Sequence, residues 1–327
     1  MHHFKVLYQK VEVKFLAIKE RFVAILRLLI LPGFDEVPLY DVLVFFIRGI
    51  FKGSVTTRAA SVAFNFFLAI FPFILFLFTL IPYLPIADFQ VTLLDLFKDI
   101  IPPNTYKEVE ETILEIVLRQ NRGLLSLSFI LTFFFSTNGI SAIMDGFNGT
   151  WHAIDTKTWV QQRLSAIFLM LTLSFFVILA IALITSGGII IQWLINQDFI
   201  RSGITAQLLQ VFRWLVIVLL TFLSLSMLYY YAPAKRKEYR FISPGSILAT
   251  ALFIVGTLAF NFYISNFSRY NALYGSIGTL IIFLMWLYFD AFILLIGFEL
   301  NASIRQAKRE NKDLEEVVDE MDRVKIK

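Results

Sequence analysis

Two carboxylates interrupt a mostly apolar run near the carboxyl end of the chain, LYGSIGTLIIFLMWLYFDAFILLIGFELN, residues 273–301. A charge at the centre of a bilayer costs about 3 kcal/mol, so an acid that stays there generally faces protein or water. Asp290 and Glu299 are nine residues apart, which is about half a turn out of phase on an α-helix. We therefore expect the two acids to lie on opposite helix faces and to have separate roles.

Glu299 stands at the expected inner boundary of this apolar run. The first apolar segment of the chain begins beside Arg58, at the same expected depth. A carboxylate and a guanidinium satisfy each other's hydrogen bonds well, so we predict a structural ion pair between Arg58 and Glu299. The alternative is a hydrated acid at the membrane interface near Arg305.

Asp290 lies deeper in the expected membrane. As a functional group, it would be a protonatable coupling site or would contact a lipid headgroup. As a structural group, it would be a protonated acid that is hydrogen-bonded to Asn65 or Asn261, which have comparable depth in other segments. The sequence leaves both alternatives open.

Further polar side chains are expected at membrane depth. Single polar residues often act as contacts between membrane helices, each worth about 0.6 kcal/mol. Here they concentrate in a few stretches, which favours a polar cavity inside the helix bundle. The candidate lining residues are Asn65, Asn138, Asn261, Tyr274 and Asp290.

The sequence contains no pattern that predicts an enzyme. Cysteine is absent, which excludes disulfides and thiolate chemistry. The three histidines, His2, His3 and His152, lack the spacing of a metal site, and neither a GxSxG nor a phosphate-binding loop occurs. We therefore expect no catalytic residues, metal or cofactor.

Composition indicates a membrane protein. The 327 residues are 58% hydrophobic and only 17% charged, with a mean hydropathy of +0.73, whereas soluble domains contain about 25% charged residues. About 20 apolar residues cross the hydrocarbon layer as a helix. Six segments qualify, which predicts an all-α bundle of six transmembrane helices at residues 60–83, 124–144, 164–194, 208–231, 247–265 and 277–299.

Most of the 29 Lys and Arg residues fall before the first span, in the loops after the second and fourth spans, and after the last span. Basic residues favour the cytoplasmic side, so both termini are predicted to be cytoplasmic. The fifth span opens with Ser243-Pro244, a helix-start pattern, and Gly245 and Ala249 then give it a face of small residues for close helix packing.

The chain divides into three predicted parts. Residues 1–39 form a basic amphipathic helix, residues 40–302 the membrane domain, and residues 303–327 a charged tail that continues the last span as a solvated helix. The outer loop at 86–122 is predicted to hold two short amphipathic helices. The expected partners are membrane lipids, with anionic headgroups at the amino-terminal helix and no nucleic acid, and a homo-oligomer is compatible with the sequence.

Four stretches resemble the YihY/virulence factor BrkB family, formerly misassigned as ribonuclease BN. They are RAASVAFNFFLAIFPFILFLFTLIP (58–82), STNGISAIMDGFNGTW (136–151), YYYAPAKRKEYRFISPGSILAT (229–250) and YNALYGSIGTLIIFLMWLYFDAFILLIGFELNA (270–302). The resemblance implies a six-helix protein of the bacterial cytoplasmic (inner) membrane and, for some members, movement of lipid or another amphipathic substrate. It implies no role for Asp290, because in many relatives this position looks like a small or neutral polar residue, from which the present sequence departs.

Three functions follow as hypotheses. The first is a transporter or lipid-handling protein with a polar intramembrane cavity. The alternative is a membrane scaffold that supports envelope integrity through its terminal helices. A ribonuclease is disfavoured, because the sequence assembles no catalytic group in water. A transporter would depend on Asp290, Asn65 or Asn138, whereas a scaffold would depend on the basic amino-terminal helix.

Overall fold

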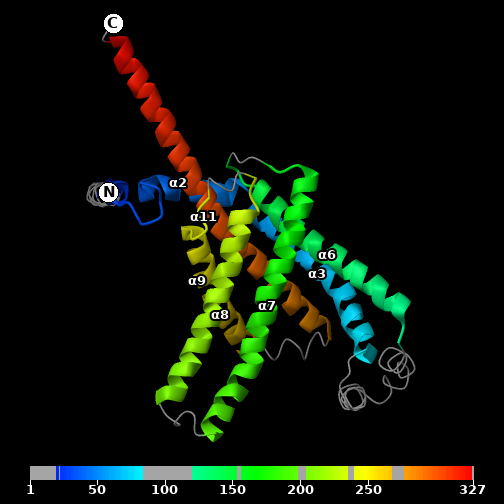
Figure 1. Cartoon of the computed structure of the whole chain (residues 1–327). Coiled ribbons are helices and arrows are strands. Elements are labelled where there is room, and N and C mark those ends of the chain that lie inside the picture. Colours follow the sequence, from blue (N-terminus) through cyan, green and yellow to red (C-terminus); the bar gives the residue numbers. More distant parts are fainter. Residues whose placement is uncertain are drawn as a thin grey trace, which may run out of the picture.

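The structure is a computed structural model of the chain and describes residues 20–21, 23–83, 120–152, 156–197, 204–234, 239–266 and 276–325. Throughout these ranges the regular structure is helical (Figure 1). Six of the helices are long and apolar enough to cross a membrane, which confirms the predicted all-α bundle. The elements are α2 (Leu39–Lys52), α3 (Val55–Leu80), η1 (Ile81–Tyr83), α6 (Arg122–Asn148), α7 (Trp159–Asn196), α8 (Ile204–Tyr231), α9 (Pro244–Asn266) and α11 (Ser276–Lys325).

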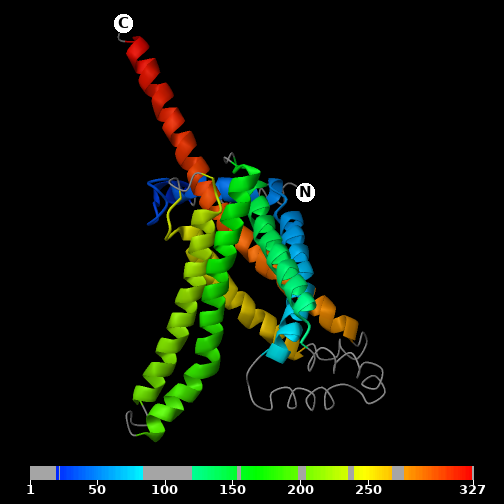
Figure 2. The ribbon, with the colours of Figure 1, turned by 45° about the vertical axis from the view of Figure 1, so that its right-hand side comes forward.

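Helix α11 is the longest element and organises the bundle. It runs for 50 residues without interruption, about 75 Å at 1.5 Å per residue. Its first half packs on α3, α9 and α6, and α2 also packs on it. Its second half projects beyond the other helices, as Figures 1 and 2 show. The expected continuation of the last span into the charged tail is therefore confirmed.

Four of the other five spanning helices form two pairs. Helix α3 packs along α6, and α7 packs along α8, while contacts between α6 and α7 join the two pairs. Helix α9 packs on α11 and on α8. Both ribbon views show the pairs close together at the end where α2 lies and divergent at the opposite end (Figures 1 and 2). The bundle therefore has a joined end and a divided end.

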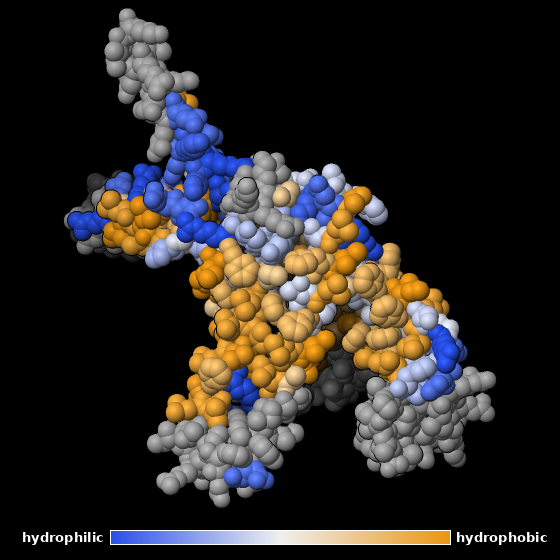
Figure 3. Space-filling model, viewed as in Figure 1, coloured by the Kyte–Doolittle hydropathy of each residue, from blue (hydrophilic) through white to orange (hydrophobic). Residues whose placement is uncertain are grey.

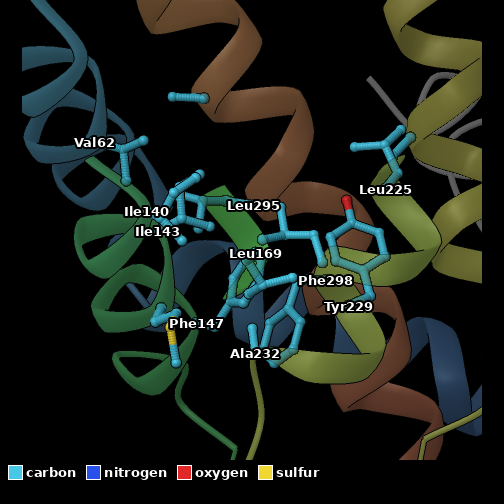
Figure 4. Close-up of a cluster of buried hydrophobic side chains, with 14 of the residues drawn as sticks. Val62, Ile140, Ile143, Phe147, Leu169, Leu225, Tyr229, Ala232, Leu295 and Phe298 are labelled. Atoms are coloured by element: carbon cyan, nitrogen blue, oxygen red, sulfur yellow. The ribbon is translucent and has the colours of Figure 1, made fainter. Parts of the chain in front are cut away.

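The joined end contains the main buried core. Phe147 of α6 stacks on Phe298 of α11 with ring centroids 4.0 Å apart, and Leu295 and Val62 are buried beside them (Figure 4). Tyr229 of α8 is also buried there and donates a hydrogen bond to the Leu294 carbonyl at 2.7 Å. Four spanning helices are thus locked together at one level.

The joined end is also the basic end. The loops after α6 and α8, the start of α3 and the projecting half of α11 all lie there, and Figure 3 shows hydrophilic surface at this end above a broad hydrophobic surface. The positive-inside rule places it at the cytoplasm, so we call it the inner end.

Helix α2 was not predicted from the sequence. It lies across the inner end of the bundle and does not run along the spanning helices (Figures 1 and 2). Its residues Val42, Phe45 and Gly49 recur at spacings of three and four and are buried, and Ile304 and Ala307 of α11 belong to the same buried cluster. This spacing was the available signal, but 14 residues are too few to register as a span.

Other expectations remain predictions. Most of the amino-terminal amphipathic helix lies outside the described residues, although residues 23–28 are helical. The outer loop lies outside them from residue 84 to 119, and its flanks are joined by a hydrogen bond from Gln120 Nε2 to the Pro82 carbonyl at 3.1 Å. The three-part division also stays a prediction; its boundary at 302/303 falls inside the continuous α11.

The predicted small-residue face of α9 is confirmed. A Cβ atom added to Gly297 of α11 would lie 2.7 Å from the Ala249 Cβ and 2.7 Å from the Gly245 carbonyl oxygen. The two helices therefore cross with backbone against backbone. Asn301 of α11 accepts a hydrogen bond from the Gly245 amide at 2.9 Å and donates one to Ser243 Oγ at 2.9 Å, so α11 also caps the start of α9.

We expect Gly245→Ala to destabilise the protein, because its methyl group would overlap the Gly297 backbone, and overpacking typically costs about 1–3 kcal/mol. The matched control is Gly123→Ala, since the nearest atom to an added Cβ there is 3.5 Å away. Thermal unfolding of the purified variants in detergent measures the difference. Equal unfolding temperatures for the two variants would contradict the close crossing of α9 and α11.

Candidate functional site

Glu299 lies at the centre of a polar network at the inner end. Its side chain is 0% exposed and its Oε2 is 3.2 Å from Arg58 Nη2, whose side chain is 10% exposed. Thr150, in the loop after α6, donates a hydrogen bond to Glu299 Oε1 at 2.7 Å. The structure thus brings together Arg58 and Glu299, the two residues proposed as an ion pair, and it adds a hydroxyl to the carboxylate.

His152 extends this network. Its Nε2 is 3.5 Å from Glu299 Oε1 and 3.0 Å from Ser303 Oγ, and that hydroxyl also donates to the Glu299 carbonyl at 2.7 Å. Burial is the main influence on the imidazole and lowers its pKa below the ordinary value of 6.5, against the opposing effect of Glu299 and together with that of Arg58. The ring is therefore favoured in its neutral form.

The network joins four segments of the inner end. Arg58 also donates to the Gly146 carbonyl of α6 at 2.6 Å, and the Phe45 ring of α2 lies edge-on to His152 with centroids 6.1 Å apart. Gly49 of α2 brings its backbone so close to the carboxylate that a Cβ atom there would overlap Glu299. Sequence reasoning missed Thr150, His152 and Ser303. The available signal was the end of the motif at residues 136–151, where the loop-forming sequence Asn-Gly-Thr stands close before His152.

The candidate cavity residues Asn65 of α3 and Asn138 of α6 have different hydrogen-bond partners and do not bond to each other. Asn65 Nδ2 donates to the Ser61 carbonyl of its own helix at 2.9 Å. Asn138 Oδ1 accepts a hydrogen bond from Arg163 Nη1 of α7 at 2.6 Å, and the Arg163 guanidinium lies 5.1 Å from the Phe134 ring centroid. Asn65 therefore bonds locally, whereas Asn138 links α6 to α7.

Asp290 lies apart from both asparagines, between α9 and α11. It lines an apolar groove of about 340 Å³ between α9 and α11, together with Gly256, Phe260, Tyr263 and Trp286 among others. Asn261 is exposed and does not line this groove, and Tyr274 lies outside the described residues. Asp290 and Glu299 thus have different surroundings, as the nine-residue spacing predicted, and Asp290 is brought to neither Asn65 nor Asn261.

A separate cavity of about 370 Å³ lies where the two helix pairs diverge. Five spanning helices line it: α3, α6, α7, α8 and α11. Ser136, Ser174 and Ser224 supply hydroxyls, and most of the remaining lining is aliphatic or aromatic, including Phe66, Ile140, Met170, Leu225 and Leu228. This cavity is more apolar than the sequence led us to expect. None of the described candidate lining residues belongs to its wall: Asn65, Asn138, Asn261 and Asp290 all lie outside it.

The described ranges contain no group of three His, Asp or Glu side chains placed to hold a metal ion. The inner network contains a carboxylate, a guanidinium and an imidazole, but the carboxylate is fully buried and each oxygen already faces a protein group. Its arrangement stabilises the joint between α2, α3, α6 and α11.

We expect the Arg58–Glu299 pair to couple strongly in a double-mutant cycle. Arg58→Met or Glu299→Gln alone leaves one buried charge without its partner, which costs about 3–5 kcal/mol. Arg58→Met with Glu299→Gln removes both charges and should recover part of that loss. Unfolding of the purified variants provides the free energies.

The partly exposed pair Asp35–Arg240 is the matched control, because such pairs couple by about 1 kcal/mol or less. Strictly additive losses for Arg58 and Glu299, or a coupling no larger than that of the control pair, would contradict a buried ion pair.

The lowered pKa of His152 predicts a pH dependence of stability. Below the ordinary pKa of 6.5 the unfolded chain binds a proton at this histidine more readily than the folded chain does, so stability falls as the pH drops below that value. His152→Gln should lose less stability than the unaltered chain between about pH 7.5 and 5.5. Parallel unfolding curves at several pH values test this. A steeper loss in the variant would mean that Glu299 holds the imidazole in its charged form.

Comparison with known proteins gives the family. The sequence profile described as virulence factor BrkB matches residues 46–320. A protein named as ribonuclease-like, YfkH of Bacillus subtilis (strain 168), is 31% identical over 254 residues, which are 77% of this chain and 91% of YfkH. A UPF0761 membrane protein of Psychromonas ingrahamii is 24% identical over 282 residues, 84% of this chain and 91% of that protein.

The UPF0761 membrane protein IL2447 of Idiomarina loihiensis is 24% identical over 211 residues, 64% of this chain and 71% of that protein. No solved structure matches. The profile covers most of the chain, and its residues include the inner network, the cavity and the groove at Asp290. The chain therefore belongs to the virulence factor BrkB family and is a multi-pass protein of the bacterial inner membrane.

Proposed function

We propose that this protein moves or binds an amphipathic, lipid-like substrate within the membrane. The observation that carries the proposal is the cavity at the junction of the two helix pairs. Its volume of about 370 Å³ lies within the range of about 300–1,000 Å³ that is usual for small-molecule sites, which are mostly apolar with a few polar groups.

The position of the cavity supports a substrate that comes from the bilayer. The joined inner end lies on one side of it, and the divergent α3–α6 and α7–α8 pairs lie on the other. Figure 3 shows the described surface hollowed between the two pairs, with hydrophobic side chains on both walls. Acyl chains match such walls, and the three serine hydroxyls offer hydrogen bonds to a polar portion of the substrate.

The divergence of the two helix pairs also supports the proposal, because it would allow the pairs to move relative to each other. Within a membrane, helices gain no hydrophobic free energy from packing against one another, so close contacts and polar pairs determine where they stay together. Here the closest contacts and the buried ion pair lie at the inner end. The two pairs therefore have a firm joint from which their other halves can separate or approach.

The proposal does not include catalysis. The UPF0761 relatives are named only as membrane proteins, and YfkH is named only as ribonuclease-like. A scaffold function is the second candidate, and the specific observation in its favour is the half of α11 that extends beyond the bundle as a charged helix. The two candidates differ in whether the intramembrane cavity is needed.

Reconstitution into liposomes tests the proposal. We expect the protein to accelerate movement of a fluorescent phospholipid between leaflets, measured by chemical bleaching of the outer leaflet with and without a proton gradient. Ser224→Trp should slow the movement several-fold, because the indole would occupy the cavity. Ser136→Trp, from a different helix, should have the same effect.

The matched control is Leu219→Trp, which lies on the same helix as Ser224 but is 51% exposed and does not line the cavity. Elution and thermal unfolding of each variant show whether it is folded. If no lipid moves under any gradient, or if the three tryptophan variants behave alike, the scaffold function replaces this proposal.

A further inference from the structure

A second cavity, of about 490 Å³, lies at the inner end outside the helix bundle. Its walls are the turn at residues 33–35, the segment at 239–244 that leads into α9, and one face of α11. Gly33 has a φ of 88°, and a Cβ atom there would lie 3.0 Å from Pro244 Cγ. The turn is thus packed directly against the start of α9, which fixes two of the walls.

The cavity is strongly basic. Among the described residues that line it, five are basic and one is acidic: Arg240, Arg305, Lys308, Arg309 and Lys312, with Asp35. The four on α11 recur at spacings of one, three and four, which places them along one side of the helix. Like charges gathered in this way repel one another, and a bound anion relieves the repulsion.

Tyr239 and Asp35 orient the basic groups. Arg305 donates to the Tyr239 hydroxyl at 3.0 Å, and its guanidinium lies 5.2 Å from the Tyr239 ring centroid. Asp35 pairs with Arg240 and with Lys308, whose Nζ is 3.2 Å from Asp35 Oδ2. One carboxylate is shared between two cations, so the lining keeps an excess of positive charge.

The start of α9 adds to the positive potential. Ser243 and Pro244 form part of the wall, and the amino-terminal end of a helix carries a partial positive charge. The amides of Gly245 and Ser246 are already bonded to Asn301 and Ser243. The helix therefore contributes its field to the cavity, while the basic side chains supply the hydrogen-bond donors.

Apolar surface adjoins the basic cavity. A neighbouring cavity shares Gly33, Asp35, Arg240 and Lys308 with it. The apolar residues Ile30, Leu31 and Pro32 and the acid Glu36 complete its lining. The same segment contains Leu28, whose side chain is 83% exposed. Figure 3 shows hydrophobic surface directly beside hydrophilic surface at this end of the molecule. A soluble anion would gain no free energy from contact with such a surface, whereas the acyl chains of a lipid would bury it.

We propose that this cavity binds the phosphate headgroup of an anionic phospholipid of the inner leaflet. Lys308, Arg309 and Lys312 hold the phosphate, and the acyl chains lie along the apolar residues 28–31. The site stands apart from the intramembrane cavity: it holds a resident lipid at the inner boundary and does not depend on whether lipid is transported.

Lipid binding to the purified full-length chain tests this inference. The probe is a short-chain phosphatidylglycerol, titrated in detergent and followed by native mass spectrometry. Phosphatidylcholine tests whether net charge is required, and inorganic phosphate and glycerol phosphate test whether a free anion suffices. We expect phosphatidylglycerol to bind more tightly than the other three probes, and its affinity to fall as salt is raised.

Lys308→Gln with Arg309→Gln and Lys312→Gln should weaken phosphatidylglycerol binding by at least about tenfold, since each basic residue near an anionic membrane surface contributes appreciably. The matched control removes the same charge at the end of the chain, with Arg323→Gln, Lys325→Gln and Lys327→Gln, and should leave the affinity nearly unchanged. Lys312 also forms an exposed ion pair with Glu316 at 3.6 Å, and exposed pairs contribute little to stability. Lys312→Gln alone, at a side chain that is 74% exposed, therefore provides a variant with little effect on folding and should also weaken binding.

Three outcomes would overturn the inference. Equal losses in the cavity and tail variants would show that only net charge matters. Equal binding of phosphatidylcholine would show that the basic groups are not used. Binding of inorganic phosphate as tight as that of the lipid would make this a site for a free anion.

Discussion

The carboxylate of Glu299 is completely withdrawn from solvent at the inner end of a membrane bundle, and this constraint shapes the surrounding structure. An unpaired charge in such a place would cost several kcal/mol, so protein groups must surround it on every side. Arg58 supplies the opposite charge, Thr150 supplies a hydroxyl, and His152 lies against the remaining space. These groups come from a helix start and a loop, which must therefore meet α11 at one fixed level.

The same level also holds close helix packing. Helices α9 and α11 cross at Gly245 and Gly297, while Phe147 and Phe298 stack beside them. Helix contacts in lipid depend on close approach and on polar pairs, because no hydrophobic free energy is gained by moving a side chain from lipid to protein. Concentrating both kinds of contact at the inner end leaves the opposite halves of α3, α6, α7 and α8 free to diverge, and the apolar cavity lies where they do so.

The inner end also separates two kinds of positive charge. Arg58 is buried and neutralised inside the network, whereas the basic face of α11 beyond residue 304 opens to the cavity beside the turn at 33–35. Helix α2 lies between the spanning helices and the cytoplasm, and its buried face joins α11 through Val42, Phe45 and Ile304. A short interfacial helix thus covers the buried ion pair while the long helix carries its remaining charge outward.

Much of the architecture followed from local pattern. The number of spans, their orientation and the unbroken last helix depend on the length of apolar runs and on the placement of Lys and Arg, both of which can be read along the chain. The close crossing at Gly245 and Ala249 was also predictable, because small residues at a spacing of four make one face of a helix. Helix α2 was missed because 14 residues neither span a bilayer nor contrast strongly with the apolar segments around them.

The sequence by itself identified the polar residues at membrane depth, and it paired Arg58 with Glu299 because both stand at the ends of spans where opposite charges are expected to meet. Only the tertiary structure decided how the other polar groups are satisfied. Asn65 bonds within its own helix, Asn138 bonds to Arg163, and Asp290 lies in the α9–α11 groove. The physical reason is that depth in the membrane depends on position along one helix, whereas a partner depends on the rotation and tilt of two helices, which packing alone determines.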